Sequence, residues 1–128
     1  MAITGLDHIV VRVKDIDEGI ESYKKMGLEL TKQMETDGIG KQAIFRLADN
    51  TFIELVAPTD PKSPVGAALE KRGEGIHTVA FNVDNLEKTV DHIKGSGAIV
   101  IQSDDMKGTA FVHPKATHGV LLQVSEKK

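Results

Sequence analysis

An internal repeat constrains the fold of this 128-residue chain more than any other feature. Residues 5–30 align with residues 75–100 without a gap, at a constant offset of 70. The matching positions include Gly5 with Gly75, Ile20 with Val90, and Gly27 with Gly97. One such segment cannot close a hydrophobic core alone, so the repeat predicts two similar halves that pack as layers of one fold.

The pattern of each half predicts a strand, a helix and then further strands. In the first half we expect strands at 6–13, 28–35, 42–47 and 51–57, and a helix at 16–26. Asp15 is a suitable N-cap for that helix, and Gly27 lies where a left-handed residue would end it. In the second half the strand–helix–strand pattern recurs, and further strands are expected at 110–113 and 120–124.

These elements predict an α+β fold. Two βαβββ modules, at about 5–57 and 75–125, would form a cupped mixed β-sheet with the helices on the outside. The segment 58–74 begins with three prolines in seven positions and continues as a short helix, so it reads as the connection between the modules. We therefore expect a single domain that spans residues 1–128.

Composition excludes several classes of function. The chain has no cysteine, which rules out disulfides, thiolate catalysis and zinc–thiolate sites and fits a cytoplasmic location. A net charge of −3 without a dense Lys/Arg cluster argues against nucleic-acid binding. The sequence offers no signal peptide and no apolar run of the roughly 18 residues that a membrane span needs.

Alternation along the strands assigns their two faces. Ile9, Val11 and Val13 predict the core face of the first strand, which leaves His8 on the other face. The same reasoning applied to the other strands places four side chains on the non-core face: His8, Glu54, Thr78 and Gln123. The repeat agrees, because His8 aligns with Thr78 and not with the adjacent His77.

A half-polar face has two interpretations at this point. It is either the solvated side of an antiparallel sheet or a surface whose side chains converge on a ligand. Apolar neighbours such as Val10 and Phe52 favour the ligand, because charged groups among apolar side chains need a partner. For Glu54 that partner is a ligand, a metal, or Arg12 or His8 across the face.

The chain resembles the vicinal oxygen chelate superfamily, which includes glyoxalase, bleomycin resistance and extradiol dioxygenase proteins. Four stretches carry the resemblance: LDHIVVRVKDIDEGIESY, FIELVAP, SPVGAALEKRGEGIHTVAFNVDNLE and HPKATHGVLLQV. Together they cover nearly the whole chain. The third and fourth are most similar to the methylmalonyl-CoA epimerase branch.

The resemblance implies paired βαβββ modules, usually in a homodimer, and a divalent metal such as Co, Ni, Mn, Fe or Zn. It implies a reaction that removes and returns a proton beside a thioester carbonyl, with a metal-stabilised enolate. Such a chain, if active, is an isomerase or lyase of the epimerase/glyoxalase type.

Carried over to this sequence, the metal positions are His8, Glu54 and Gln123, with Thr78 where relatives have a second histidine. Gln123 replaces a glutamate that serves relatives as ligand and base, which leaves Glu54 as the catalytic base. Threonine hydroxyl and glutamine carbonyl are poor ligands for transition metals, so a weak site is expected. Thr78 and Gln123 become substrate-binding candidates, together with Arg12.

The resemblance also places Lys115, in the stretch HPK, beside the CoA portion of an acyl-CoA ligand, where it could meet a phosphate. The alternative to an enzyme is a metal-independent protein that binds a small molecule, as bleomycin-resistance members do. A dioxygenase would need two histidines on the non-core face, and His8 is the one that alternation places there.

Overall fold

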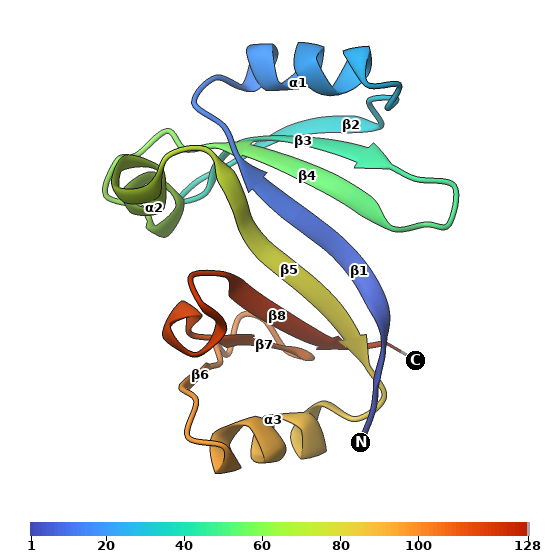
Figure 1. The fold of residues 1–128 in the computed structure, drawn as a ribbon, viewed down its shortest axis with the longest axis vertical. Helices are drawn as coiled ribbons and strands as arrows, with labels where there is room; N and C mark the ends of the chain where they lie inside the picture. Colours follow the sequence, from blue (N-terminus) through green and yellow to red (C-terminus); the bar gives the residue numbers. More distant parts are fainter. Residues whose placement is uncertain (128) are drawn as a thin grey trace. The chain divides into compact units, whose positions relative to one another are not determined.

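The computed structural model describes residues 1–127, and its elements follow the predicted order (Figure 1). In chain order they are β1 (Ile3–Arg12), α1 (Ile16–Lys25), β2 (Lys32–Thr36), β3 (Gly40–Arg46), β4 (Phe52–Ala57), α2 (Pro64–Arg72), β5 (Gly75–Val83), α3 (Leu86–Gly95), β6 (Val100–Ile101), β7 (Thr109–Val112), the 3-10 helix η1 (Pro114–Thr117) and β8 (Leu121–Glu126). Within the described residues the strands form an open eight-stranded sheet in the order β2-β3-β4-β1-β5-β8-β7-β6. Pairing is parallel between β1 and β4 and between β5 and β8, so the prediction of a mixed α+β fold is confirmed.

The chain divides into two compact units. The central unit is His8–His77, and the terminal unit combines Met1–Asp7 with the chain from Thr78 onward. Each unit holds strands of the sheet and an α-helix that packs on one of its faces. The assignment of the whole chain to one domain stays a prediction.

Helix α1 forms where the sequence predicts it. The Asp15 side chain accepts a hydrogen bond from the backbone N–H of Glu18 at 3.0 Å and so caps the first turn. Gly27 follows the helix with a φ of 101°, a conformation that costs glycine least. The apolar stripe of Ile16, Ile20 and Tyr23 faces the strands, and acidic and basic side chains occupy the exposed face.

The strand after α1 begins later than predicted. We expected it at 28–35, whereas β2 runs from Lys32 to Thr36. Leu28 donates its backbone N–H to the carbonyl of Tyr23 at the end of α1, so the chain is still turning away from the helix there. Leu28 and Leu30 are apolar because they pack against the core, which made this irregular segment look like a strand.

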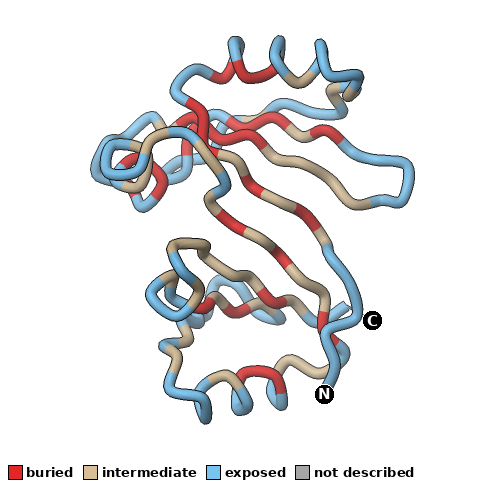
Figure 2. The backbone as a smooth tube through the Cα atoms, viewed as in Figure 1, coloured by how far each residue is buried: buried red, intermediate tan, exposed pale blue. Residues whose placement is uncertain are grey.

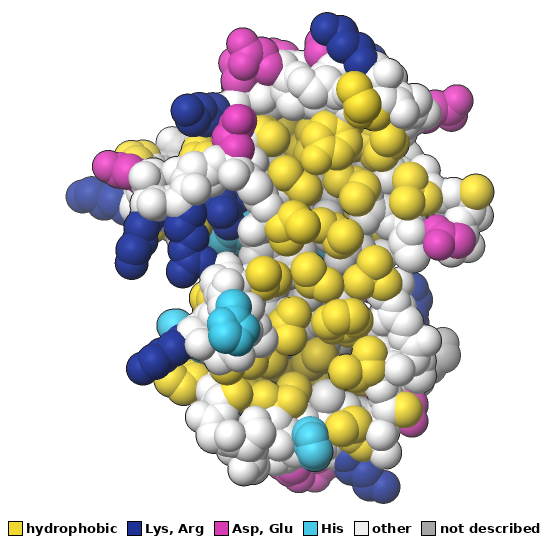
Figure 3. Space-filling view, in the orientation of Figure 1, with side chains coloured by type: hydrophobic (Ala, Val, Ile, Leu, Met, Phe, Trp, Pro, Cys, Tyr) yellow, Lys and Arg dark blue, Asp and Glu magenta, His cyan; other side chains and the backbone are white. Residues whose placement is uncertain are grey.

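The core of the central unit lies between α1 and the strands beneath it, as the buried segments in Figure 2 show. Its buried members are Val13, Ile16, Ile20, Ala43, Phe45, Leu55 and Ala57. Figure 3 shows hydrophobic side chains filling this layer below the helix, with charged groups along the helix's outer side. Leu55 and Phe45 have no exposed surface, so they anchor this core.

A second, smaller cluster covers part of the opposite face. Val10 and Val56, which alternation assigns to the non-core side, are buried there against Val65 of α2. Ser63 caps α2 by accepting from the backbone N–H of Gly66 at 3.0 Å. Because α2 covers one end of this face, the non-core face of the central unit is not simply a solvated surface.

The terminal unit repeats the arrangement. Asn85 caps α3 by accepting from the backbone N–H of Lys88 at 2.9 Å, as Asp15 caps α1. The buried members of its core are Val83, Val90, Ala110 and Val124. None of the helices within residues 1–127 is long and apolar enough to cross a membrane.

The central core predicts a measurable cost for a cavity. We expect Leu55→Ala to lower the free energy of unfolding by about 2–5 kcal/mol, because it removes a fully buried side chain from a packed layer. Urea denaturation followed by circular dichroism measures this change. The matched control is Leu47→Ala, at a side chain that is 40% exposed, which should change stability much less. Equal effects of the two variants would contradict the assignment of the core.

Candidate functional site

Strand pairing arranges the non-core face of the central unit as three rows of side chains. The register pairs β3 with β4 and β4 with β1, and residues at matched positions on one face lie side by side. The rows are Gln42–Val56–Arg12, Ile44–Glu54–Val10 and Arg46–Phe52–His8. Glu54 therefore occupies the centre, with apolar side chains beside it along the row and polar groups at the corners.

The side chain of Glu54 forms a hydrogen bond with β3. Its Oε2 accepts from Nε2 of Gln42 at 3.0 Å. Oε1 of Gln42 in turn accepts from the hydroxyl of Thr36 at 2.6 Å. Glu54 is half-buried and Gln42 is 7% exposed, so the carboxylate is held by a buried amide and not by a positive charge.

His8 is held by stacking. Its ring lies parallel to that of Phe52, with centroids 4.4 Å apart and planes 8° apart. On the neighbouring strand the guanidinium of Arg46 lies 5.3 Å from the centre of the Phe52 ring, in cation–π contact. His8 is buried, and this stack fixes the plane of its imidazole next to the row that contains Glu54.

Arg12 is engaged by the connection between α2 and β5. Its Nε donates to the carbonyl of Gly73 and its Nη1 to that of Ile76, both at 3.1 Å. Nη1 also contacts Nδ1 of His77 at 3.2 Å. The sequence leaves Arg12 and His8 among the possible partners of Glu54, and the structure gives Gln42 as its hydrogen-bond partner. The proposed role of Arg12 in substrate binding stays a prediction.

His77 is an electrically neutral part of this connection. Partial burial, together with the positive charges of Arg12 and Arg72, lowers the pKa of His77 from 6.5 to about 4. The neutral ring can accept a hydrogen bond from Nη1 of Arg12 at Nδ1, which places its own hydrogen on Nε2.

The terminal unit presents an equivalent face with different chemistry. The register places Gln123 between Ala80 and Phe111, as it places Glu54 between Val10 and Ile44. Nε2 of Gln123 donates to the hydroxyl of Ser125 at 3.4 Å, and that hydroxyl also bonds Thr109 at 2.9 Å. Thr78, which matches His8 in the repeat, is 4% exposed. A neutral amide thus takes the central position that a carboxylate takes in the other unit.

The donor chemistry of these residues does not fit a tight divalent metal site. Catalytic metal centres use three protein ligands, drawn mainly from His, Cys, Asp and Glu. Residues 1–127 contain no group of three or more such side chains that could hold a metal ion. Of the predicted ligands, His8 and Glu54 are strong donors, and Gln123 can offer its amide oxygen.

Other candidates lie on exposed loops. Lys115 and His118 are exposed around η1, and Nδ1 of the exposed His113 accepts from the backbone N–H of Lys115 at 3.0 Å. His92 is exposed near the end of α3.

Sequence reasoning missed Gln42. The signal was available, since Ala43 and Phe45 are the apolar positions of β3 and leave Gln42 on the same face as Glu54. What the sequence did not reveal was the register between β3 and β4, which brings the two side chains together.

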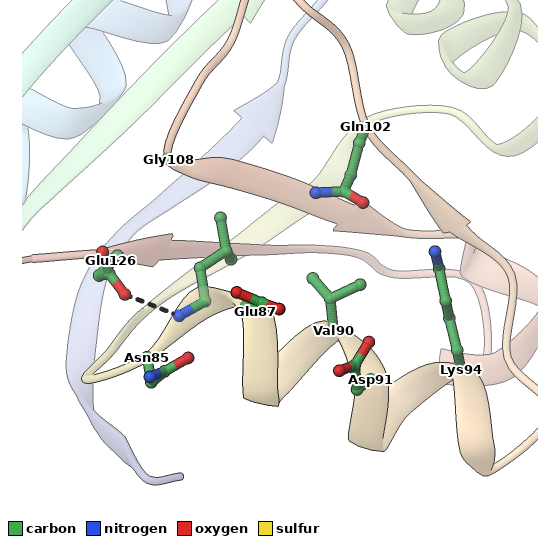
Figure 4. Close-up of a pocket in the computed structure, with 9 residues that line it drawn as sticks. Asn85, Glu87, Val90, Asp91, Lys94, Gln102, Gly108 and Glu126 are labelled. Carbon is green, nitrogen blue, oxygen red and sulfur yellow. Dashed lines mark hydrogen bonds between the residues drawn. The ribbon is translucent and has the colours of Figure 1, made fainter.

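A polar pocket beside α3 lies on the other face of the terminal unit (Figure 4). Its lining includes Glu87, Asp91, Lys94 and Gln102. Oε1 of Glu126 accepts from the backbone N–H of Leu86 at 2.9 Å, so this carboxylate stabilises the start of the helix. Val90 of α3 lines this pocket, so the pocket lies on the face of the sheet that α3 covers. Gln123 lies on the other face.

Comparison with known proteins defines the family. The model of the glyoxalase-like domain matches residues 6–123, so the chain belongs to that family, within the vicinal oxygen chelate superfamily. Ethylmalonyl-CoA/methylmalonyl-CoA epimerase of Cereibacter sphaeroides is 30% identical over 94% of this chain and 96% of its own. The resemblance predicted from the sequence is confirmed.

Solved structures agree with this membership. The crystal structure of methylmalonyl-CoA epimerase from Mycobacterium tuberculosis is 30% identical, with a TM-score of 0.81 over 98% of this chain and 89% of that one. A methylmalonyl-CoA epimerase in complex with methylmalonyl-CoA and NH4+ is 28% identical, with a TM-score of 0.82 over 98% of this chain and 96% of that one.

The environment of His77 predicts a pH dependence of stability. Because its pKa is lowered on folding, the unfolded chain binds more protons than the folded chain between about pH 6.5 and about pH 4. This part of the stability is present above pH 6.5 and is lost as the pH falls to about 4. We expect His77→Gln to reduce this loss, because Gln can accept from Arg12 without titrating.

Urea unfolding at a series of pH values measures the effect. His92→Gln, at an exposed histidine, is the matched control and should retain the pH dependence of the unsubstituted protein. A His77→Gln protein whose stability falls just as steeply would contradict the assignment.

Proposed function

We propose that this protein is an epimerase-type isomerase that removes and returns the proton beside the carbonyl of an acyl-CoA thioester. One observation carries the proposal: a half-buried carboxylate, Glu54, stands at the centre of a face framed by apolar side chains. The three relatives described above are named as methylmalonyl-CoA or ethylmalonyl-CoA/methylmalonyl-CoA epimerases, and one of them is solved in complex with methylmalonyl-CoA. Together they support a carbon acid next to a thioester as the substrate.

Glu54 acts as the base in this proposal. Its carboxylate takes the proton from C2, the C–H electron pair moves into the enolate, and the negative charge develops on the thioester oxygen. Glu54 can return the proton only to the face of C2 from which it came, which restores the starting isomer. The epimer forms when a second donor, here proposed to be water, protonates the opposite face of the enolate and Glu54 gives its proton to solvent. Donors aimed at the developing oxyanion are needed, and His8 is held rigidly enough to serve as one.

The reaction is proposed without a step through a metal, because the donor set does not fit one. Gln123 and Thr78 act as neutral hydrogen-bonding groups for the substrate in this proposal. The prediction of a weak metal site at His8, Glu54 and Gln123 is tested separately below.

The ligand is proposed to be an acyl-CoA. Lys115 is an exposed residue of η1 and carries a charge suited to a CoA phosphate. Arg12 is assigned to the substrate in the sequence-based prediction, although its hydrogen bonds stabilise the connection from α2 to β5. A homodimer and a cytoplasmic location stay predictions drawn from the family resemblance and the composition.

A second candidate function is binding without catalysis. Its specific support is the face of the terminal unit, where Thr78, Gln123 and Ser125 are neutral hydrogen-bonding groups. This alternative predicts affinity for a small molecule that does not depend on Glu54 acting as a base.

Proton exchange at C2 tests the proposed function. We incubate the protein with methylmalonyl-CoA in D₂O, with and without added Co²⁺, and follow loss of the C2 proton by NMR. Glu54→Gln should lower the exchange rate by about 10²–10⁴-fold, because the amide cannot take the proton.

The control is Glu35→Gln, the same chemical change at an exposed position on β2, which should leave exchange unchanged. Circular dichroism checks that both variants are folded. Full activity in Glu54→Gln would exclude Glu54 as the base. Binding of methylmalonyl-CoA without exchange in the unsubstituted protein would favour the second candidate.

Substitution towards stronger ligands tests the predicted metal positions. The double variant Thr78→His with Gln123→Glu would supply four His or carboxylate donors together with His8 and Glu54. We expect it to bind Co²⁺ at least tenfold more tightly than the unsubstituted protein, as measured by calorimetry. Unchanged affinity would contradict the assignment of these positions.

A further inference from the structure

Three side chains from neighbouring strands form a hydrogen-bonded series that ends on Glu54. Thr36 of β2 donates to Oε1 of Gln42 of β3, and Nε2 of Gln42 donates to Oε2 of Glu54 of β4. The distances are 2.6 Å and 3.0 Å. These three side chains are not part of the core between α1 and the sheet. That core lies on the opposite face of the strands and contains Ala43, Phe45 and Leu55.

The two hydrogen bonds fix the orientation of the Gln42 amide. The carboxylate of Glu54 can only accept, so Nε2–H of Gln42 points towards β4 and its Oε1 towards β2, where the hydroxyl of Thr36 donates to it. A flipped amide would direct its oxygen at the oxygen of the carboxylate. Gln42 is therefore held as a donor to Glu54.

The surroundings make this donor important to the carboxylate. In the row of Glu54 the neighbours are Val10 and Ile44, which cannot donate a hydrogen bond. Arg12 directs its hydrogen bonds to the backbone of the α2–β5 connection and to His77. Gln42 is also almost fully buried, with Met34 and Val56 beside it in register, so water competes poorly for its amide.

We propose that Gln42 is a positioning residue for Glu54, which holds Oε2 of the carboxylate and leaves Oε1 directed at the substrate's C–H bond. This inference rests on the proposed function of Glu54 as the base. Gln42 takes no proton in the reaction. It fixes the rotation of the carboxylate and stabilises its charged form by donating one hydrogen bond, with Thr36 supporting it from the next strand.

Kinetics of C2 proton exchange test the proposal. Gln42→Met keeps the length of the side chain and removes the donor. We expect its kcat for exchange of methylmalonyl-CoA to fall about tenfold to a hundredfold, the effect of losing a hydrogen bond to a charged group. KM should stay nearly unchanged, because Gln42 acts on the base and does not touch the substrate. Thr36→Val, which removes only the supporting hydrogen bond to Oε1 of Gln42, should give a smaller fall in kcat.

The matched control is Gln33→Met, the same substitution at an exposed position on β2. It should leave both kinetic constants unchanged. Thermal denaturation of all three variants separates loss of activity from loss of folding. A Gln42→Met protein that exchanges the proton as fast as the unsubstituted protein would overturn the positioning role while leaving the proposed function intact.

A spectroscopic measurement tests the hydrogen bond without relying on activity. In ¹⁵N–¹H NMR spectra, the side-chain amide protons of Gln42 should shift when Glu54→Gln removes the charged acceptor. Glu35→Gln should not move them. If the Gln42 amide signals are the same in the unsubstituted protein and in Glu54→Gln, the proposed link is wrong. If the unsubstituted protein shows no C2 exchange, the proposed function fails and the positioning role fails with it, whatever the amide signals show.

Discussion

The parallel register between β1 and β4 is the constraint on which the candidate site depends. It sets His8 beside Phe52 and Val10 beside Glu54. A shift by one residue would turn the side chains of one strand to the opposite face, placing Glu54 against the core under α1. The register is secured from both sides, by the core that contains Leu55 and by the smaller cluster of Val10, Val56 and Val65. Burial on both faces therefore fixes the position of the carboxylate.

The two units share the geometry of their central strands but differ in the chemistry of the central side chain. Glu54 and Gln123 hold equivalent central positions in their own units, each between two apolar neighbours along its row. The first is a carboxylate that accepts from an amide, and the second is an amide that donates to a hydroxyl. Of these two central side chains, only the carboxylate can take a proton from carbon at neutral pH.

Much of the arrangement could be predicted from the sequence, for a physical reason. Residues at period two show which side of each strand is covered by a helix, and so His8, Glu54, Thr78 and Gln123 are each assigned to the other side of their own strand. The helix cap at Asp15 is a local interaction, which makes it readable in the same way. Contacts between strands depend on register, which the sequence of a single chain does not state. The partner of Glu54 and the cover provided by α2 therefore appeared only in the structure.

The non-core face of the central unit presents Glu54 as a carboxylate held in place and suited to act as a base. A carboxylate with apolar neighbours on both sides loses hydration, and a hydrogen bond to its charged form offsets part of that loss. Gln42 supplies such a bond without bringing a positive charge, so the carboxylate is stabilised but not neutralised by an ion pair. A salt bridge to Arg12 would have made Glu54 a weaker base, because a close cation favours the deprotonated form. Arg12 instead holds the connection between α2 and β5, which separates the structural cation from the carboxylate that we assign to proton transfer.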